Sequence, residues 1–339
     1  MERYANTLAR SLIQLGHPVV FHAHTVDEAL AKSIGLGLEH LPIRSFPHKL
    51  QDFRFFREVD RWRKATDGVQ LTLSRVRVRD FAVCGGTHRG YLARARKFAG
   101  VFDWFQVWME TEAYRCARVV VSHSDLCTRE LIDLYRIPES KIVTLYPPVD
   151  ERFAQACSPQ QRIESRQKLG LPLDRAILFF PSGGASRKGL KPLCQALDGL
   201  AEQFLLVVAG KPPTTEKWPF LRTLGYLDDM ATAYRAADFT LIGSYYEPFG
   251  LVGPESVLCG TPLISEENVG CLPVIKPQFV YKFSVWDRAS IRQAISMAIA
   301  SARRGEHSLN QPLDALEYNP YPLEHAKAIL RSANAPRRE

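Results

Sequence analysis

The sequence predicts an α/β protein of two domains, each built on an open parallel sheet. The chain has 339 residues, and 46% of them are hydrophobic. It is long enough for two domains of the usual size, about 100 to 200 residues each. Short apolar runs typical of buried strands alternate with segments of helical periodicity in both halves, and this alternation is the pattern of α/β folds.

The expected elements follow this alternation along the chain. In the first half, the patterns predict a helix at 2–15 and strands at 18–25, 69–74, 119–124 and 142–145. In the second half, they predict strands at 176–180, 204–209, 238–243 and 262–265, with helices near 187–201, 228–237 and 251–259. A last helix is expected at 321–331.

A proline pair marks the expected boundary between the domains. Pro147 and Pro148 lie in the segment 146–153 and stop any strand or helix there. We therefore expect domains at 1–148 and 149–317, with the segment from about 318 to 339 as a candidate to pack back on the first. Open α/β sheets bind ligands beyond the carboxyl ends of their strands, so a ligand is expected in the cleft between the domains.

The net charge of +8 is concentrated in one segment. Residues 44–97 hold fourteen Lys and Arg against five Asp and Glu. An anionic partner is indicated, and nucleic acid, acidic lipid and phosphorylated glycan all fit the charge. Nucleic acid is disfavoured because no helix-turn-helix and no aromatic-interleaved basic motif is present.

Cysteine spacing and hydropathy bear on the compartment. The seven cysteines are scattered and never spaced as CxxC, so they predict neither a disulfide framework nor a zinc site. No window reaches the roughly 18 apolar residues of a membrane span, and the N-terminus does not resemble a signal peptide. We expect a cytoplasmic protein.

The first motif that carries chemistry follows the strand at 238–243. The loop Ser244-Tyr-Tyr-Glu-Pro-Phe-Gly250 leads into a helix with Glu255 in its first turn and Gly260 after its end. A helix N-terminus attracts anions, and two carboxylates, Glu247 and Glu255, flank it, where they can accept hydrogen bonds from sugar hydroxyls. The alternative is that both are ordinary surface acids favoured by the helix dipole.

The second motif follows the strand at 176–180. Pro-Ser-Gly183-Gly184-Ala-Ser-Arg187-Lys188-Gly places small residues and two cations at the start of a helix. Small residues let backbone amides approach a ligand, and the cations can neutralise a diphosphate. Neither GxxxxGK[ST] nor GxGxxG is present, which disfavours ATP hydrolysis and dinucleotide binding. A plain turn between strand and helix remains the alternative.

The third motif is Leu224-Gly-Tyr-Leu-Asp-Asp229. Backbone groups of Tyr226 and Leu227 on such a loop can read the edge of a nucleotide base. For Asp228, the more ordinary interpretation is that it caps the next helix.

These three motifs, in this order, resemble retaining glycosyltransferases of the GT-B fold, family 4 (glycosyl transferases group 1). The stretch YRAADFTLIGSYYEPFGLVGPESVLCGTPLI is specific, and the resemblance covers about residues 2 to 275. It implies two Rossmann-like domains facing across a cleft. It also implies hexosyl transfer with retention from a nucleoside-diphosphate sugar, most often a UDP or GDP sugar, without a metal or other cofactor. The acceptor would be a glycan or glycolipid, as in bacterial lipopolysaccharide or surface polysaccharide synthesis.

The resemblance also implies roles for individual residues. Glu247 would contact the donor sugar as a catalytic residue, and Glu255 would hold the ribose hydroxyls. The remaining donor-binding candidates are Gly183, Gly184, Arg187, Lys188, Tyr226, Leu227, Phe249, Gly250 and Leu251. The segment 83–91 resembles the family's acceptor-side loop and makes His88 a catalytic candidate, although a lone histidine in a glycine loop is more often structural.

The chain departs from the family pattern in three places. Ser256 stands where the family has alanine, and Leu272-Pro-Val274 replaces an expected acid, so donor preference is open. No strand precedes the helix at 2–15, although the first strand of this architecture is central in its sheet. We therefore expect the natural protein to begin upstream of Met1. If Met1 is the start, the alternative function is a catalytically impaired nucleotide-sugar-binding partner subunit.

Residues 52–64 predict a basic amphipathic helix. Arg54, Arg57, Arg61 and Lys64 project from one side, with Phe55, Phe56, Val59 and Trp62 roughly opposite. Such a helix can lie on an anionic membrane, which places the enzyme at the inner face of the membrane as a peripheral protein. The alternative is that the aromatic side belongs to the protein core and the cations are solvated.

Overall fold

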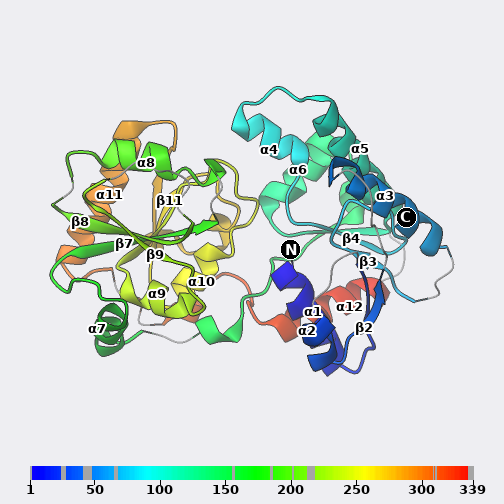
Figure 1. The fold of residues 1–339 in the computed structure, drawn as a ribbon, viewed down its shortest axis with the longest axis horizontal. Helices are drawn as coiled ribbons and strands as arrows, with labels where there is room; N and C mark the ends of the chain where they lie inside the picture. The colour runs from blue at the N-terminus through cyan, green and yellow to red at the C-terminus, as the bar shows by residue number, and fades with distance from the viewer. Residues whose placement is uncertain are drawn as a thin grey trace. The chain divides into compact units, whose positions relative to one another are not determined.

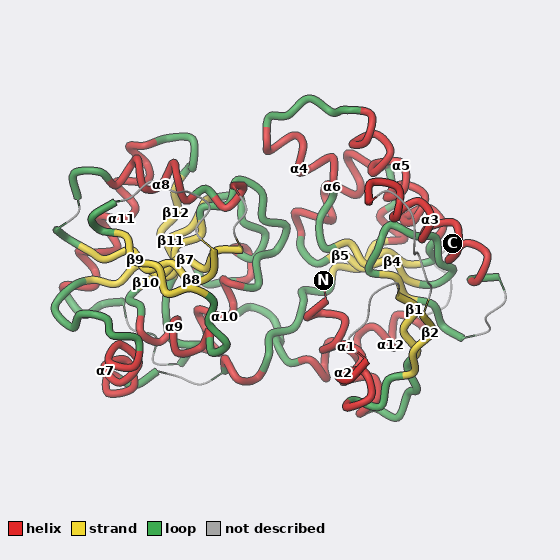
Figure 2. The backbone as a smooth tube through the Cα atoms, viewed as in Figure 1, coloured by secondary structure: helices red, strands yellow, loops and turns green. Residues whose placement is uncertain are grey.

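The computed structural model describes residues 2–23, 28–40, 48–64, 68–154, 157–183, 186–200, 202–211, 218–307, 309 and 311–334. The chain divides into two compact units, unit 1 (residues 1–148 and 319–339) and unit 2 (residues 149–318) (Figures 1 and 2). The boundary falls next to Pro148, in the proline segment. Among the described residues, no helix has the length and apolarity that crossing a bilayer requires.

Within its described residues, unit 1 contains two parallel sheets. β1 (Val20–Ala23) pairs with β2 (Gly37–His40), and a second sheet has the order β3 (Leu71–Thr72), β4 (Phe81–Cys84), β5 (Val119–Ser122), β6 (Ile142–Thr144). Its helices are α1 (Glu2–Gln14), α2 (Glu28–Ser33), α3 (His48–Trp62), α4 (His88–Ala95), α5 (Val101–Cys116), α6 (Asp125–Tyr135) and α12 (Pro322–Asn334), with the 3-10 helix η1 (Glu139–Lys141). The expectation of one sheet in this half is corrected, because β1 and β3 are not hydrogen-bonded neighbours.

The core of unit 1 joins the two ends of the chain. Tyr4 and Leu8 of α1 share a buried cluster with Phe81 and Val121 of the sheet and with Ile329 of α12. The apolar face of α1 is thus covered by a helix more than 300 residues later in sequence, and α12 belongs to unit 1.

Unit 2 contains one six-stranded parallel sheet with the order β12-β11-β10-β7-β8-β9. The strands are β7 (Ala176–Gly183), β8 (Phe204–Lys211), β9 (Leu221–Gly225), β10 (Phe239–Ile242), β11 (Leu263–Glu266) and β12 (Val280–Phe283). The helices are α7 (Pro159–Lys168), α8 (Leu190–Leu197), α9 (Met230–Ala236), α10 (Val252–Leu258) and α11 (Arg288–Arg303), with the 3-10 helices η2 (Glu151–Phe153), η3 (Ser186–Lys188), η4 (Leu272–Val274), η5 (Pro277–Phe279) and η6 (Pro312–Ala315).

Helices cover both faces of this sheet. α8 and α11 lie on one face, and α7, α9 and α10 lie on the other (Figures 1 and 2). All residues of β10 and β11 are buried, as expected for strands covered on both sides. The order of strands reverses between β7 and β10, because the chain moves outward from β7 through β8 and β9 and then returns to start β10. That switch point is where open α/β sheets bind ligands.

Candidate functional site

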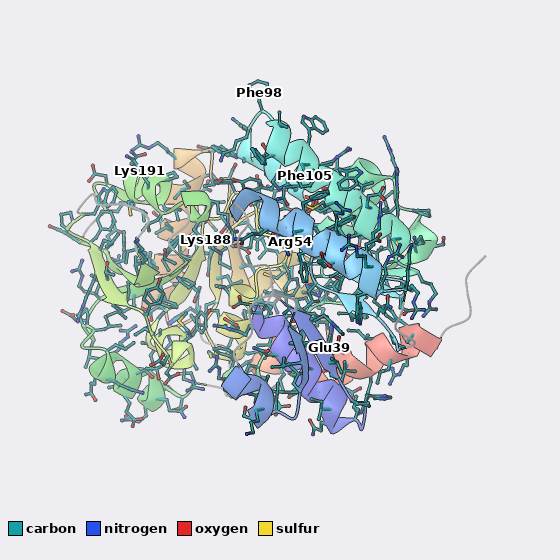
Figure 3. All side chains as sticks on the ribbon, turned by 45° about the vertical axis from the view of Figure 1, so that its right-hand side comes forward. Glu39, Arg54, Phe98, Phe105, Lys188 and Lys191 are labelled. Carbon is teal, nitrogen blue, oxygen red and sulfur yellow. The ribbon has the colours of Figure 1, made fainter. Side chains whose placement is uncertain are left out.

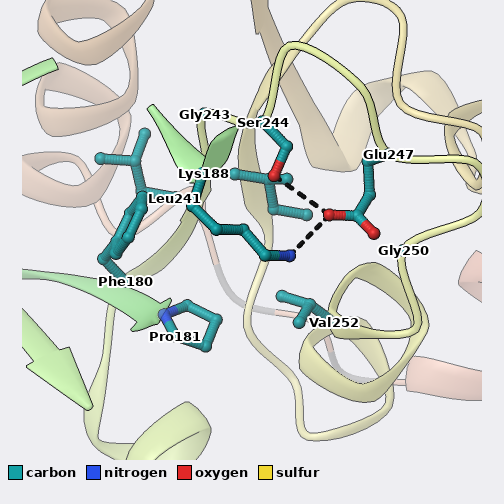
Figure 4. Close-up of a pocket in the computed structure, with 10 residues that line it drawn as sticks. Phe180, Pro181, Lys188, Leu241, Gly243, Ser244, Glu247, Gly250 and Val252 are labelled. Carbon is teal, nitrogen blue, oxygen red and sulfur yellow. Dashed lines mark hydrogen bonds and ion pairs between the residues drawn. The ribbon is translucent and has the colours of Figure 1, made fainter. Parts of the chain in front are cut away.

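A pocket lies at the switch point of the unit 2 sheet, beyond the carboxyl ends of β7 and β10 (Figure 4). It has an apolar floor made by the ends of the two strands and a polar wall made by the loops that follow them. Its lining residues are Phe180, Pro181, Lys188, Leu241, Ile242, Gly243, Ser244, Glu247, Gly250 and Val252. Three of the predicted donor residues, Lys188, Glu247 and Gly250, are thus brought together.

Two cations and one carboxylate dominate the electrostatics of this pocket. The Nζ atom of Lys188 lies 2.6 Å from Oε2 of Glu247, and Nη1 of Arg187 lies 3.9 Å from the same oxygen. Ser244 donates a hydrogen bond to that oxygen at 3.0 Å. The side chains of Lys188 and Glu247 are mostly buried, whereas that of Arg187 is 40% exposed. The cluster keeps an excess of positive charge next to open space, and that suits an anionic ligand.

Backbone geometry explains how Lys188 reaches the pocket. Gly189 caps α8 in the left-handed conformation, with φ of +75°. A Cβ atom at Gly189 would lie 2.2 Å from the carbonyl oxygen of Gly243, so only glycine lets the loop after β7 pass this close to the loop after β10. This close approach sets Lys188 opposite Glu247.

A second close approach holds the loop of Glu247. Gly270 donates its N–H to the carbonyl oxygen of Glu247 at 3.0 Å, and a Cβ atom at Gly270 would lie 1.8 Å from the carbonyl oxygen of Pro248. Phe249 is buried in this loop, and Leu251 is the N-cap residue of α10. Their predicted role as amide donors to a sugar stays a prediction.

Glu255 occupies a different environment from Glu247. It is 5% exposed, and its Oε2 atom accepts a hydrogen bond from the Tyr234 hydroxyl at 2.9 Å. It is not one of the pocket's lining residues. Ser256, the departure from the family pattern, has its hydroxyl oxygen 2.7 Å from the Thr240 hydroxyl oxygen and 2.8 Å from the carbonyl oxygen of Thr261. Its hydroxyl thus ties α10 to β10.

Of the remaining donor candidates, Gly183, Tyr226 and Leu227 are not among the residues that line this pocket. Gly183 is the exposed last residue of β7, and Gly184 lies outside the described residues. Tyr226 and Leu227 follow β9 at the edge of the sheet, where Tyr226 is largely exposed. The expectation that Asp228 caps the following helix is wrong. Asp229 is the N-cap of α9 and accepts a hydrogen bond from the N–H of Thr232 at 3.1 Å, because α9 begins at Met230.

In unit 1, His88 begins α4 just beyond the carboxyl end of β4. The preceding residue, Thr87, is the N-cap and donates its hydroxyl to Glu130 at 2.6 Å. Nε2 of His88 lies 2.8 Å from Oδ1 of Asp103, and the side chain of His88 is 17% exposed. Two hydrogen bonds lower the pKa of the Asp103 carboxyl. The larger effect comes from the N–H of Gly100 and the smaller from His88. Asp103 is therefore a charged partner that orients the imidazole.

A buried carboxylate fixes the backbone of the same loop. Glu110 is 2% exposed and accepts hydrogen bonds from the N–H of His88 at 2.9 Å, from Nε of Arg75 at 2.9 Å and from the hydroxyl of Tyr135. Burial, together with the charge of Glu110, raises the pKa of Tyr135. The sequence analysis missed Asp103 and Glu110 because both lie on α5, and only the tertiary fold brings that helix to His88.

The structure places the aromatic side of residues 52–64 in the core. Phe56 and Val59 of α3 are buried against Val76 and Met109, and Phe55 and Trp62 pack against the same cluster. The core alternative is thus correct for this face. Arg57, Arg61 and Lys64 are exposed, so solvent reaches the cations.

Comparison with known proteins decides the family. Residues 1–153 match the family described as Glycosyltransferase Family 4, and residues 161–300 match Glycosyl transferases group 1. A probable transglycosylase from Burkholderia thailandensis is 36% identical over 338 residues, which covers 97% of this chain and 92% of that protein. The chain belongs to the family 4, group 1 glycosyltransferases of the GT-B fold.

Solved structures of this fold resemble the whole chain. WaaG, a glycosyltransferase involved in lipopolysaccharide biosynthesis, matches with a TM-score of 0.80 at 16% identity and covers 98% of this chain and 96% of its own. Anabaena HepE in complex with UDP and glucose matches with a TM-score of 0.72 at 16% identity, covering 99% and 96%. The predicted fold class is confirmed. The alternative of a non-catalytic partner subunit is not favoured, because the likenesses are to glycosyltransferases.

Proposed function

We propose that this glycosyltransferase moves a hexosyl unit, with retention, from a nucleoside-diphosphate sugar to a glycan or glycolipid acceptor. The structural likeness to WaaG, and to HepE with UDP and glucose bound, supports a UDP or GDP sugar as donor. The likeness to WaaG also supports a role in bacterial lipopolysaccharide or surface polysaccharide synthesis. The proposed place of action is the cytoplasm, at the inner face of the membrane.

The observation that carries this proposal is the cluster of Arg187, Lys188 and Glu247 at the switch point of the sheet. Two cations share one carboxylate there, so a diphosphate can pair with Lys188 and Arg187 while Glu247 keeps the hydrogen bond from the Ser244 hydroxyl. Bond cleavage at the sugar places negative charge on the departing diphosphate, and fixed cations stabilise that charge most in the transition state. Glu247, released from Lys188, is then available to the sugar hydroxyls.

The other roles are proposed from the family to which the chain belongs. Gly250 lines the pocket with φ of +86°, a conformation that only glycine adopts without strain, so the backbone at 249–251 can turn its amides toward a sugar. Glu255 would hold the ribose, and Tyr226 and Leu227 the base. Since cations already serve the diphosphate, we propose that transfer needs no metal and proceeds at the same rate in EDTA.

On the acceptor side, His88 is the proposed catalytic residue. Asp103 holds its Nε2 atom, and Glu110 holds its backbone N–H, so the ring is fixed from two directions. A fixed imidazole can act as a general acid or base.

A thermal-shift panel of UDP, GDP and ADP sugars tests the donor site. A ligand at about 100 times its dissociation constant adds about 2.7 kcal/mol to the free energy of unfolding. We expect one nucleotide class to produce a shift of this size, and the free sugar without its nucleotide to produce none. A panel in which no nucleotide sugar stabilises the protein would contradict the proposal.

A further inference from the structure

One carboxylate in unit 1, that of Asp103, binds two partners at the same time. Its Oδ2 atom accepts a hydrogen bond from the N–H of Gly100 at 2.8 Å, and its Oδ1 atom lies 2.8 Å from Nε2 of His88. Asp103 is the third residue of α5, and Gly100 is the N-cap residue of this helix. The bond to Gly100 therefore fixes the carboxylate at the start of α5, with its other oxygen directed at the imidazole.

The backbone that carries the imidazole is fixed as well. The hydroxyl of Thr87 accepts a hydrogen bond from the N–H of Gly90 at 3.0 Å, which caps α4. The N–H of His88 donates to the buried carboxylate of Glu110 at 2.9 Å. The ring of His88 also lies against that of Tyr91, with 6.0 Å between the ring centroids. Backbone and ring are thus held independently.

The contact between the two side chains decides which ring nitrogen carries the hydrogen. The hydrogen bonds from Gly100 and His88 lower the pKa of the Asp103 carboxyl, so this group is ionised at neutral pH and can only accept. A neutral imidazole has one N–H and one nitrogen with a free lone pair. Nε2 must therefore carry the hydrogen, because it faces the carboxylate, and Nδ1 carries the lone pair.

The second ring nitrogen of His88 is available to a ligand. Among the described residues, Nδ1 has no hydrogen-bond partner, since the contacts of this residue are those of Nε2, of the backbone N–H and of the ring face. The side chain is 17% exposed, and Nδ1 is not one of the buried polar atoms that lack a partner. A hydroxyl group that reaches the ring can thus donate to Nδ1.

We propose that Asp103 is a positioning residue that fixes His88 in the Nε2–H tautomer and makes Nδ1 the nitrogen that meets the acceptor hydroxyl. The role of Nδ1 rests on the proposed function, in which His88 is the catalytic residue on the acceptor side. The choice of tautomer is a property of unit 1 alone, so it can be tested without turnover.

This tautomer suits proton transfer from the acceptor. As the acceptor oxygen bonds to the anomeric carbon, the bond from that carbon to the diphosphate oxygen breaks, and its electron pair leaves with the diphosphate. The hydroxyl proton passes to the lone pair of Nδ1. The imidazolium that forms keeps its Nε2–H on the Asp103 carboxylate, which stabilises the positive charge.

Replacing the carboxylate by an amide should reverse the tautomer. In Asp103→Asn, the amide oxygen takes the place of Oδ2, because only an acceptor fits the N–H of Gly100. The NH₂ group then faces Nε2 of His88, and since it can only donate, Nε2 must carry the lone pair. His88 should change to the Nδ1–H tautomer, while the start of α5 keeps its hydrogen bond.

Nitrogen NMR of the full chain, labelled with nitrogen-15 histidine, measures the tautomer without donor or acceptor. Spectra are recorded at about pH 8, where an ordinary imidazole is neutral. The variant His88→Gln identifies the His88 signals among those of the nine histidines. The wild type should show Nε2–H, and Asp103→Asn should show Nδ1–H. A wild type with Nδ1–H, or an Asp103→Asn variant that keeps Nε2–H, would overturn the proposal.

The matched control is Asp287→Asn in unit 2. Asp287 also lies at a helix start, where it accepts a hydrogen bond from the N–H of Ala289 at 2.9 Å, but it does not contact His88. This variant should show the wild-type tautomer. Asp103→Glu should show it too, because a glutamate at this helix position still accepts from the cap residue and from Nε2. A tautomer change in the control equal to that in Asp103→Asn would overturn the proposal.

Turnover tests the role of Nδ1. The probes are the donor found in the thermal-shift panel and the core oligosaccharide of lipopolysaccharide as acceptor. Asp103→Asn should lower kcat by at least about 10²-fold, as expected when general acid–base catalysis is lost, with KM for the donor unchanged. Asp103→Glu should retain more of kcat than Asp103→Asn. A wild-type kcat in a variant whose tautomer has changed would overturn the role of Nδ1. Donor-induced thermal shifts report separately on the proposed function.

Discussion

Glu110 in unit 1 and Glu247 in unit 2 each hold a cation beside a loop that leaves a parallel strand, yet their surroundings differ. Glu110 is almost fully buried, and its two oxygens accept from Arg75, Tyr135 and the backbone of His88. Glu247 faces a pocket, and its cations lie where a ligand can reach them. The acid of unit 1 thus maintains a conformation, whereas in the mechanism we propose the acid of unit 2 exchanges its partners during the reaction.

The largest effect should come from replacing the pocket acid. Glu247→Gln should lower kcat by about 10²- to 10³-fold, since a pre-organised electrostatic contact to the reacting group is lost. The free energy of unfolding should fall by less than about 1.5 kcal/mol, because Lys188 loses a charged partner but the amide oxygen still accepts from Ser244. Steady-state rates and urea unfolding measure the two quantities. A normal kcat together with a large loss of unfolding free energy in Glu247→Gln would contradict the catalytic role of this acid.

Replacing the buried acid of unit 1 should produce the opposite pattern. Glu110→Gln should cost about 2 to 3 kcal/mol of unfolding free energy, because Arg75 and the N–H of His88 lose a charged acceptor. The control is Glu112→Gln, whose side chain is 27% exposed and pairs with Arg77. Its cost should stay below about 1 kcal/mol. If the two variants are equally stable in urea, Glu110 does not hold the loop.

Acid should destabilise unit 1 at a higher pH than unit 2. Burial lowers the pKa of His123 to about 3 and that of His325 to about 4 in unit 1. In the unfolded state these histidines take up protons near pH 6.5, well before they do so in the folded state. Their contribution to the free energy of unfolding is therefore complete above about pH 6.5 and is lost as the pH falls toward the folded-state values. At pH 5 each histidine should cost about 2 kcal/mol.

The corresponding buried group of unit 2 responds later. Burial alone would raise the pKa of Asp238, but the hydrogen bond with His307 and the charge of Arg166 outweigh it and lower the pKa. Asp238 therefore contributes to the free energy of unfolding when the pH is above 3.8, the ordinary pKa of its carboxyl. This contribution is lost only as the pH falls below 3.8. Hydrogen exchange from pH 7 to 5 should thus show unit 1 opening first, and His325→Gln should reduce that loss. Equal opening of both units would contradict the difference.

The sequence predicted the fold best where the pattern is local. Long buried runs such as β7 and β8 were predicted at nearly their observed positions, and the proline segment lies at the unit boundary. β4 was missed, although it is fully buried, because its four residues directly follow the charged run Arg75–Asp80. β2, β9 and β12 were also missed, because strands of 4, 5 and 4 residues are too short to show a clear pattern.

The site shows the same limit. Lys188 and Glu247 could be paired from sequence because each follows a recognisable strand and glycine loop, and parallel strands bring such loops together. Asp103 and Glu110 could not, because their contacts with His88 depend on how α5 packs against the sheet. The aromatic residues of α3 and α5 cannot be told apart by residue type, and only the packing shows that Phe56 of α3 is buried whereas Trp104 and Trp108 of α5 are exposed.

The most direct test of the central claim is donor binding by two single-lysine variants of unit 2. Lys188 lies in the pocket and Lys191 is exposed one turn away (Figure 3). In calorimetric titrations with the donor found in the panel, Lys188→Ala should bind at least about tenfold more weakly, as expected for a lost charge-assisted contact of roughly 1.5 to 3 kcal/mol. Lys191→Ala should bind as the wild type does. Equal affinity for Lys188→Ala and the wild type would show that the pocket at the switch point is not the donor site.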